Sequence, residues 1–122
     1  MTSEITSRRY GLRAGQKLQT AAEFDRARKG RERRSDALFV IQCVDNDGRG
    51  ARLGMAVSVR AAGNSVNRNR LRRVIRESFR THRHEMPAVD VLVTARPPAT
   101  AAPNRELFAS LAALWQEIGA RK

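Results

Sequence analysis

The chain has 122 residues, of which 24 are Lys or Arg and 12 are Asp or Glu, and its formal net charge at pH 7 is +12. This length favours one domain with one modest core, which a hydrophobic content of 41% is enough to form. So positive a charge argues against an ordinary metabolic enzyme and favours nucleic acid as the partner, ahead of an acidic membrane surface or an acidic protein.

The first part of the chain predicts an arm followed by a short helix. Residues 1–17 show neither helical nor strand periodicity, so we expect an irregular N-terminal arm. Residues 18–122 are expected to form a single domain, which the positive charge predicts to bind nucleic acid. Thr20 and Glu23 have the spacing of a capping box, which predicts a helix that begins there and ends near Gly30. The polar and basic residues 31–36 are interpreted as a connector.

Two extended runs come next. Apolar β-forming residues over 37–44 predict a buried strand, and turn-forming residues follow over 45–50. The run over 52–59 alternates apolar residues with others, so it is predicted to be a second strand. Because a turn-rich segment joins them, we expect the two runs to pair as a hairpin.

The second half of the chain predicts a helix, a strand and a helix. Over residues 64–83 apolar side chains recur at spacings of three and four, the pattern of an amphipathic helix. Pro87 ends that helix at the latest, and alternating valines over 89–93 predict a strand. The apolar pattern over 104–118 predicts a final helix.

The helix over 64–83 carries an unusual concentration of positive charge. At 100° per residue, five arginines fall within an arc of about 100° opposite the apolar stripe. They are Arg72, Arg73, Arg76, Arg80 and Arg83. Only Glu77 on that helix offers a nearby counter-charge, so the face repels itself unless an anion covers it. Guanidinium groups bind phosphate in bidentate fashion, which favours nucleic acid over a plain solvated helix or an acidic protein partner.

Residues near this helix offer further contacts. Free backbone N–H groups before it, together with Arg68 and Arg70, can hold a phosphate, although Asn64 or Ser65 also fits a simple helix N-cap. Phe24, with Arg28 one turn later, can stack on an unpaired strand; equally, a lone Phe can belong to the core.

Sites for other chemistry fail on spacing. His82 and His84 lack the spacing of a zinc site and are surrounded by positive charge, and the glycines over 48–54 lead into a strand instead of a helix. No Ser/His/Asp or Cys/His set and no carboxylate cluster can be assembled. We therefore expect no catalytic residue and no metal site in this chain.

Cysteine usage and hydropathy bear on location. The single Cys43 cannot form an intramolecular disulfide, which favours a reduced, cytoplasmic protein. Residues 1–10 lack the apolar core of a secretion signal, and no apolar stretch approaches the roughly 20 residues that span a membrane. We expect a cytoplasmic location and no membrane partner.

The segment from Arg68 to Arg80 resembles the signature helix of the bacterial ribonuclease P protein component. Residues 53–58, 63–66, 87–93 and 104–115 are also similar to that family, so the resemblance runs from about residue 18 to residue 118. It implies a single-domain α+β sandwich in the order α-β-β-β-α-β-α, similar to the second domain of ribosomal protein S5, with a left-handed β-α-β crossover.

The resemblance also implies an activity. Proteins of this family are accessory subunits of ribonuclease P, an endoribonuclease in which a catalytic RNA with Mg²⁺ removes the 5′ leader of precursor tRNA. The expected partners are therefore the catalytic RNA, bound one to one by a monomeric protein, and precursor tRNA. The Mg²⁺ is expected to be held mainly by the RNA, with none bound tightly by the protein alone.

Two sets of residues correspond to the family's binding surfaces. The resemblance implies catalytic-RNA binding by Arg60, Asn64, Arg68, Asn69, Arg70, Arg72, Arg73, Arg76 and Arg80. It implies leader binding, in a cleft between the first helix and the sheet, by Phe24, Arg28, Phe39, Arg52 and Arg96.

The chain departs from the family pattern at two places. Arg28 stands where the family often has a second aromatic residue, and Val59-Arg60 where it often has a lysine pair. Leader binding is therefore expected to depend more on charge than on stacking. The alternatives are a ribosomal or other structured-RNA-binding protein without a role in cleavage, a helix-in-groove DNA binder, and an autonomous nuclease.

Overall fold

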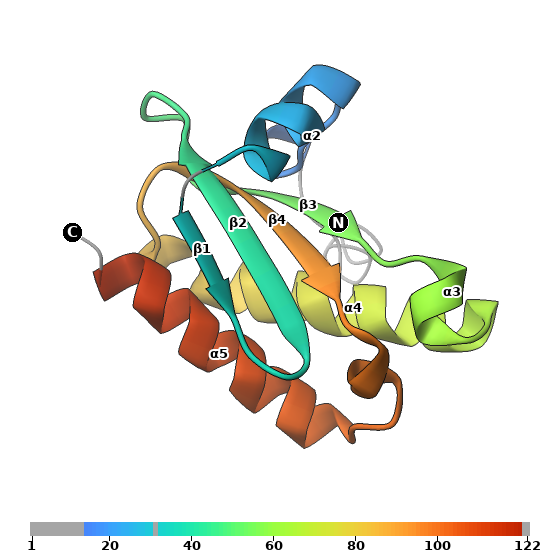
Figure 1. Ribbon diagram of the computed structural model, residues 1–122. Coiled ribbons are helices and arrows are strands. Elements are labelled where there is room, and N and C mark those ends of the chain that lie inside the picture. The colour runs from blue at the N-terminus through green and yellow to red at the C-terminus, as the bar shows by residue number, and fades with distance from the viewer. Residues whose placement is uncertain (1–13, 31, 121–122) are drawn as a thin grey trace, which may run out of the picture.

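The computed structural model describes residues 14–30 and 32–120 (Figure 1). Its main elements are α2 (Ala21–Arg28), β1 (Glu32–Ser35), β2 (Phe39–Asp45), β3 (Arg52–Ala56), α3 (Val59–Ala62), α4 (Ser65–His82), β4 (Val89–Ala95) and α5 (Asn104–Ala120). Short 3₁₀ turns lie at Ala14–Gln16, Arg83–Glu85 and Pro97–Thr100. The α-β-β-β-α-β-α order is confirmed, with the one-turn helix α3 inserted before α4.

The four strands form one mixed sheet in the order β1-β2-β4-β3. Strand β4 is antiparallel to β2 and parallel to β3, with Leu53 aligned with Val91. The predicted hairpin between the second and third strands is therefore wrong, because β4 lies between them. The crossover through α3 and α4 returns the chain to the start of β3, so β4 can run parallel to β3 and take the central position.

The predicted connector over 31–36 is also corrected, because Glu32–Ser35 forms strand β1 and pairs with β2. Among the described strands it lies at the edge of the sheet, next to β2. Charged side chains are common on edge strands, where they discourage pairing with a further chain. A strand of this composition has no apolar alternation for sequence reasoning to detect.

The core lies between the sheet and the pair of helices α4 and α5, which cover one face, whereas α2 lies on the other (Figure 1). The apolar stripe of α4 is buried as predicted. Ser78 sits within that stripe and accepts a hydrogen bond from the indole N–H of Trp115 at 2.8 Å, while the Trp115 ring contacts Phe79 edge-on. The buried indole N–H is thereby satisfied, which fixes α5 against α4.

Helix α2 begins as the sequence predicted. Thr20 Oγ1 accepts from the backbone N–H of Glu23 at 3.1 Å, and the Glu23 carboxylate accepts from the backbone N–H of Thr20. The end of the predicted arm is not irregular, since Lys17 forms a parallel bridge with Leu53 of β3. The rest of the predicted arm, residues 1–13, lies outside the described residues. Among the helices over 14–30 and 32–120, none has both the length and the apolar character to cross a bilayer.

Candidate nucleic-acid interface

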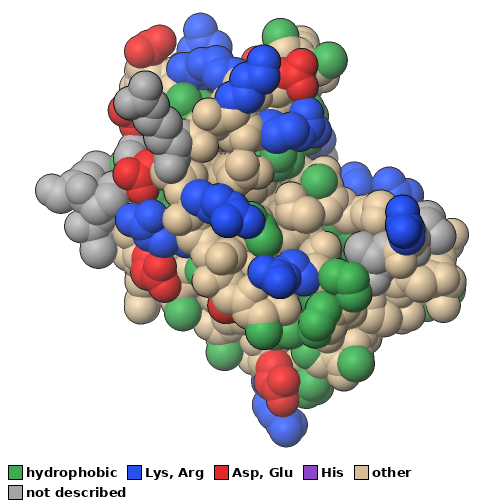
Figure 2. All heavy atoms as spheres, viewed as in Figure 1, with side chains coloured by type: hydrophobic (Ala, Val, Ile, Leu, Met, Phe, Trp, Pro, Cys, Tyr) green, Lys and Arg blue, Asp and Glu red, His purple; other side chains and the backbone are tan. Residues whose placement is uncertain are grey.

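The sheet face that α2 crosses is distinct from the core face. Along β4, Val91 and Val93 belong to the core under α4 and α5, whereas Asp90 and Leu92 contact α2 and its surroundings. This division follows from the alternation of side chains along a strand. On the face seen in Figure 2, Lys and Arg side chains spread over α2 and the centre of the molecule, with hydrophobic side chains and some acidic ones between them. Such a mixture of cations and apolar surface suits a nucleic acid with unpaired bases.

Phe24 lines a groove of about 180 Å³ between α2, β3 and α4. The ring is half-buried and lies directly over Gly54. A Cβ at Gly54 would come within 2.7 Å of Phe24 Cε1 and 2.8 Å of Leu18 Cδ1, so glycine permits α2 to approach the sheet this closely. The other residues that line the groove are Lys17, Leu18, Leu53, Met55, Arg72 and Arg76.

A second groove, of about 450 Å³, lies beyond the end of β3. It is lined by Met55, Ala56, Val57, Ser58, Arg68, Arg72, Thr94 and Ala95. Arg72 of α4 lines both grooves, so this residue lies where the groove beside α2 meets the groove at the end of β3. Met55 and Arg72 line both grooves, so the grooves adjoin, and their walls combine apolar residues with arginines, which suits an extended single strand.

The five arginines of the predicted basic face do not all remain available. Arg80 forms an ion pair with Glu77 at 2.8 Å, and Arg83 Nε donates to the carbonyl of Ala51 at 2.7 Å. Partial burial lowers the pKa of Arg76, and the positive charges of Arg72 and Arg73 lower it further. Arg72, Arg73 and Arg76 thus form a mutually repelling group that an anion would stabilise.

Arg68 and Arg70 contribute to the fold at the start of α4. Arg68 Nε donates to the Val57 carbonyl at 2.6 Å, and Arg70 donates to Asn104 Oδ1 at 2.6 Å and to the Thr100 carbonyl at 2.9 Å. These bonds attach α4 to the end of β3 and to the start of α5. RNA binding by these two arginines stays a prediction, because their contacts here are with the protein.

The other residues assigned to the catalytic RNA lie around the start of α4. Asn64 is its N-cap, since Asn64 Oδ1 accepts from the backbone N–H of Asn67 at 2.8 Å. Arg60, on α3, is exposed, and Asn69 lines a further groove of about 330 Å³ together with Arg73 and Asn104. Their contacts with RNA also stay predictions.

Two of the five residues predicted for leader binding are corrected. Phe39 is fully buried in the core on the opposite face of the sheet, so it cannot contact a leader in the cleft. Arg52 is only 8% exposed and its guanidinium binds Asp90, so it does not present a free cation. The sequence does not show which face of its strand Phe39 occupies, nor that Arg52, which does lie on the α2 side, is paired with a buried carboxylate.

Arg28 and Arg96 are exposed and stay candidates. Arg28 forms an ion pair with Asp25 at 2.7 Å, which reduces its net charge. Arg96 follows Ala95, which lines the larger groove, but neither groove contains Arg96 itself. Of the predicted leader-binding set, Phe24 is the residue that lines one of these two grooves.

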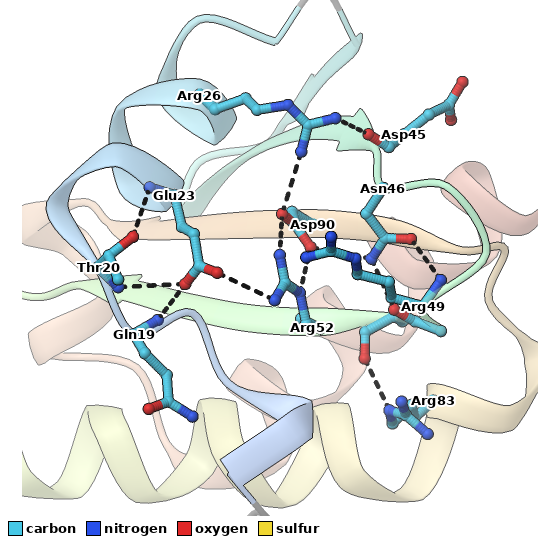
Figure 3. A network of polar contacts seen from close by, with 12 residues as sticks. Gln19, Thr20, Glu23, Arg26, Asp45, Asn46, Arg49, Arg52, Arg83 and Asp90 are labelled. Atoms are coloured by element: carbon cyan, nitrogen blue, oxygen red, sulfur yellow. Dashed lines mark hydrogen bonds and ion pairs between the residues drawn. The ribbon is translucent and has the colours of Figure 1, made fainter.

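A buried polar network beneath α2 was not predicted. Arg52 Nε and Nη2 each donate to a different oxygen of the fully buried Asp90 carboxylate at 2.7 Å, and Asn46 Nδ2 donates to Asp90 Oδ1 at 2.9 Å (Figure 3). Burial alone would raise the pKa of Asp90, but the hydrogen bonds from Arg52 and Asn46 hold it below its ordinary value. Asp90 is the one acidic residue in the valine-rich strand β4, a signal that could have indicated a buried ion pair.

Among the described residues, acidic side chains do not form a cluster that could bind a metal ion. Over residues 14–30 and 32–120, no three His, Cys, Asp or Glu side chains lie together as metal ligands would. The carboxylates of Glu23 and Asp90, on the α2 side of the sheet, are bound to Arg52. The two grooves offer arginines, Lys17 and the ring of Phe24, a set suited to an anionic strand.

Comparisons with known proteins agree with this geometry. A family model described as Ribonuclease P matches residues 12–119. The ribonuclease P protein component of Thioalkalivibrio sulfidiphilus is 44% identical over 84 residues, which are 69% of this chain and 70% of that protein. The component of Coxiella burnetii is 32% identical over 108 residues, 88% of this chain and 89% of that protein.

Solved structures give the same result. The RNase P protein of Staphylococcus aureus matches with a TM-score of 0.76 and 32% identity, covering 84% of this chain and 94% of that one. The RNase P protein of Thermotoga maritima matches with a TM-score of 0.74 and 25% identity, covering 84% of this chain and 96% of that one.

Proposed function

Because this chain belongs to the ribonuclease P protein family, we propose that its two surfaces bind the two RNAs of a ribonuclease P holoenzyme. The chain is the accessory protein subunit of this endoribonuclease and acts in tRNA 5′ processing together with an RNA subunit. The basic side of α4 would bind the catalytic RNA, and the grooves beside α2 would bind the 5′ leader of precursor tRNA.

One observation carries this assignment. Arg72 lines both grooves and belongs to the same cationic group as Arg73 and Arg76. A leader in the grooves and an RNA on α4 would therefore meet at shared positive charge. Cations between two polyanions lower their repulsion, which would hold the leader in register with the catalytic RNA.

The protein would contribute position and charge, and the hydrolytic chemistry would come from Mg²⁺ held mainly by the RNA. Glu23 and Asp90 support this division, because both carboxylates already bind Arg52. We further propose that one monomeric protein binds one RNA in the cytoplasm. Cys43 is buried and in no disulfide, which is consistent with a reducing compartment.

The experiment that tests this function is precursor-tRNA cleavage by the cognate catalytic RNA at low Mg²⁺, with and without the protein. We expect the protein to restore cleavage at the mature 5′ end, because added cations reduce the demand for free Mg²⁺. Failure of well-folded protein to do so would favour a structured-RNA binder without a role in cleavage. Cleavage by protein and Mg²⁺ alone would indicate an autonomous nuclease, and equal competition by duplex DNA a DNA binder.

The Phe24→Ala substitution tests the cleft separately. Loss of one aromatic stacking surface is expected to weaken holoenzyme binding of precursor tRNA by about tenfold, while mature tRNA binds nearly as before. Equilibrium binding to both RNAs measures the difference. Phe108→Ala is the matched control, because Phe108 is also half-buried but packs on the core from α5. Equal losses for the two RNAs would contradict leader binding at Phe24.

A further inference from the structure

We propose that Glu23 and Arg52 are positioning residues for the leader. In this view the chain of contacts from Asp90 through Arg52 to Glu23 fixes α2 over the sheet and thereby sets the height of the Phe24 ring. The inference rests on the proposed function of the cleft. Because the Arg52 side chain is buried, we infer that it acts by holding α2 in place and not by direct contact with RNA.

The apolar contact between α2 and the sheet is small, with the half-buried Phe24, Val44 and Ala56 packed against it. It contains eight residues, of which only Ala27 is buried. The apolar cluster beneath it has three buried residues, Leu18, Ala27 and Leu92. A helix this short is unstable by itself, so its placement depends on what attaches it to the sheet.

The polar network supplies that attachment at two points (Figure 3). Near the start of α2, Glu23 Oε2 accepts from Arg52 Nη1 at 3.1 Å, while Arg52 is bound on its other side to Asp90. One turn later, Arg26 Nη1 lies 3.5 Å from Asp90 Oδ2, and Arg26 also donates to the carbonyl of Asp45. Both attachments lead to the same buried carboxylate, so α2 has a fixed anchor.

Glu23 joins this anchor to the helix backbone. Its Oε1 accepts from the backbone N–H groups of Gln19 at 2.6 Å and Thr20 at 3.1 Å, while its Oε2 binds Arg52. One side chain therefore caps the helix and attaches it to the sheet. Phe24 is the next residue, so any movement at Glu23 moves the aromatic ring.

The position of the ring allows little tolerance. Phe24 lies so close to the sheet that only a glycine fits beneath it at Gly54. On its open side the ring faces the groove that Arg72 and Arg76 also line. Stacking and dispersion contacts weaken steeply when the gap grows by a fraction of an ångström to an ångström, so a displaced ring would bind a base less well.

The Glu23→Gln substitution tests this role. Glutamine keeps an oxygen that can cap α2 but lacks the charge that binds Arg52. In the holoenzyme we expect precursor tRNA to bind about fivefold more weakly, with mature tRNA unchanged. Glu106→Gln is the matched control, because Glu106 is an exposed first-turn glutamate of α5 and its substitution changes the net charge equally. The control is expected to bind both RNAs as the unmodified protein does.

A double-mutant cycle with Phe24→Ala separates positioning from a general structural role. If Glu23 acts through the ring, Glu23→Gln costs nothing further in the Phe24→Ala background. Additive losses of affinity in the double variant would overturn the inference. So would a Glu23→Gln variant that loses as much affinity for mature tRNA as for precursor tRNA, or one that binds precursor tRNA as well as Glu106→Gln does. If the unmodified holoenzyme itself does not distinguish precursor from mature tRNA, the proposed function fails instead.

Discussion

Replacing Asp90 with alanine is expected to lower the free energy of unfolding by about 3–5 kcal/mol, because it leaves the guanidinium of Arg52 buried without its partner. Asp90 is fully buried, and Arg52 is nearly so. Arg26 and Asn46 would lose a contact as well. Urea unfolding of the free protein, followed by circular dichroism, measures the change.

The control is a double variant in which both charges are removed. Arg52→Met with Asp90→Leu leaves no buried charge at this pair and should recover much of the stability lost in Asp90→Ala. If Asp90→Ala alone costs less than about 1 kcal/mol, the carboxylate is not the anchor of the network. The double variant should also bind precursor tRNA weakly despite its stability, since Glu23 has lost its link to the sheet.

The Arg52–Asp90 pair makes the stability of the folded protein depend on pH. The pKa of Asp90 lies below its ordinary value in the folded protein. A depressed carboxyl pKa contributes stability above its unfolded pKa of about 4, and that contribution is lost as the pH falls through the folded pKa. Unfolding curves near pH 6 and about pH 3 should therefore differ more for the unmodified protein than for the Arg52→Met/Asp90→Leu variant.

The second large effect is expected at the junction of the two RNA surfaces. Arg72→Gln combined with Arg76→Gln should weaken assembly with the catalytic RNA at least about tenfold at low salt. The plot of log K against log salt has a negative slope, and its magnitude should fall by roughly two. Both side chains belong to the mutually repelling group on α4, where a phosphate relieves repulsion. Titration of labelled RNA at several salt concentrations measures both quantities.

A charge-matched control isolates the site from the net charge. Arg49→Gln combined with Arg105→Gln also removes two positive charges, at exposed positions of the loop after β2 and the first turn of α5. We expect that variant to retain most of the affinity and nearly the full salt slope. If the two double variants behave alike, the effect belongs to overall charge and not to this part of α4.

Because Arg72 lines both grooves, the same variant should affect the substrate. Precursor tRNA should lose more affinity than mature tRNA even when the variant is saturated with catalytic RNA. An arginine that served only the catalytic RNA would give equal losses for the two substrates. The ratio of the two affinities therefore distinguishes a shared cationic junction from a surface that serves one partner.

Local patterns in the sequence determined most of the elements. The capping box at Thr20 and Glu23, the three-four spacing that buries Leu71 and Phe79, and the alternating valines of β4 each predicted an element that the structure contains. These predictions succeed because capping hydrogen bonds and the periodic burial of side chains both depend on residues that are close together in the sequence. The groove position of Phe24 followed from the same information combined with the family resemblance.

Only the tertiary structure decided which strands are neighbours and which side chains face the cleft. The local sequence around residues 45–50 is typical of a hairpin between β2 and β3. In the sheet, however, β4 lies between these two strands, although it comes more than 30 residues later in the chain. That insertion brings Asp90 opposite Arg52 and turns an expected RNA contact into a buried ion pair. It also fixes the register that directs Phe39 into the core. Pairing between distant strands depends on the free energy of the whole fold, which no single segment contains.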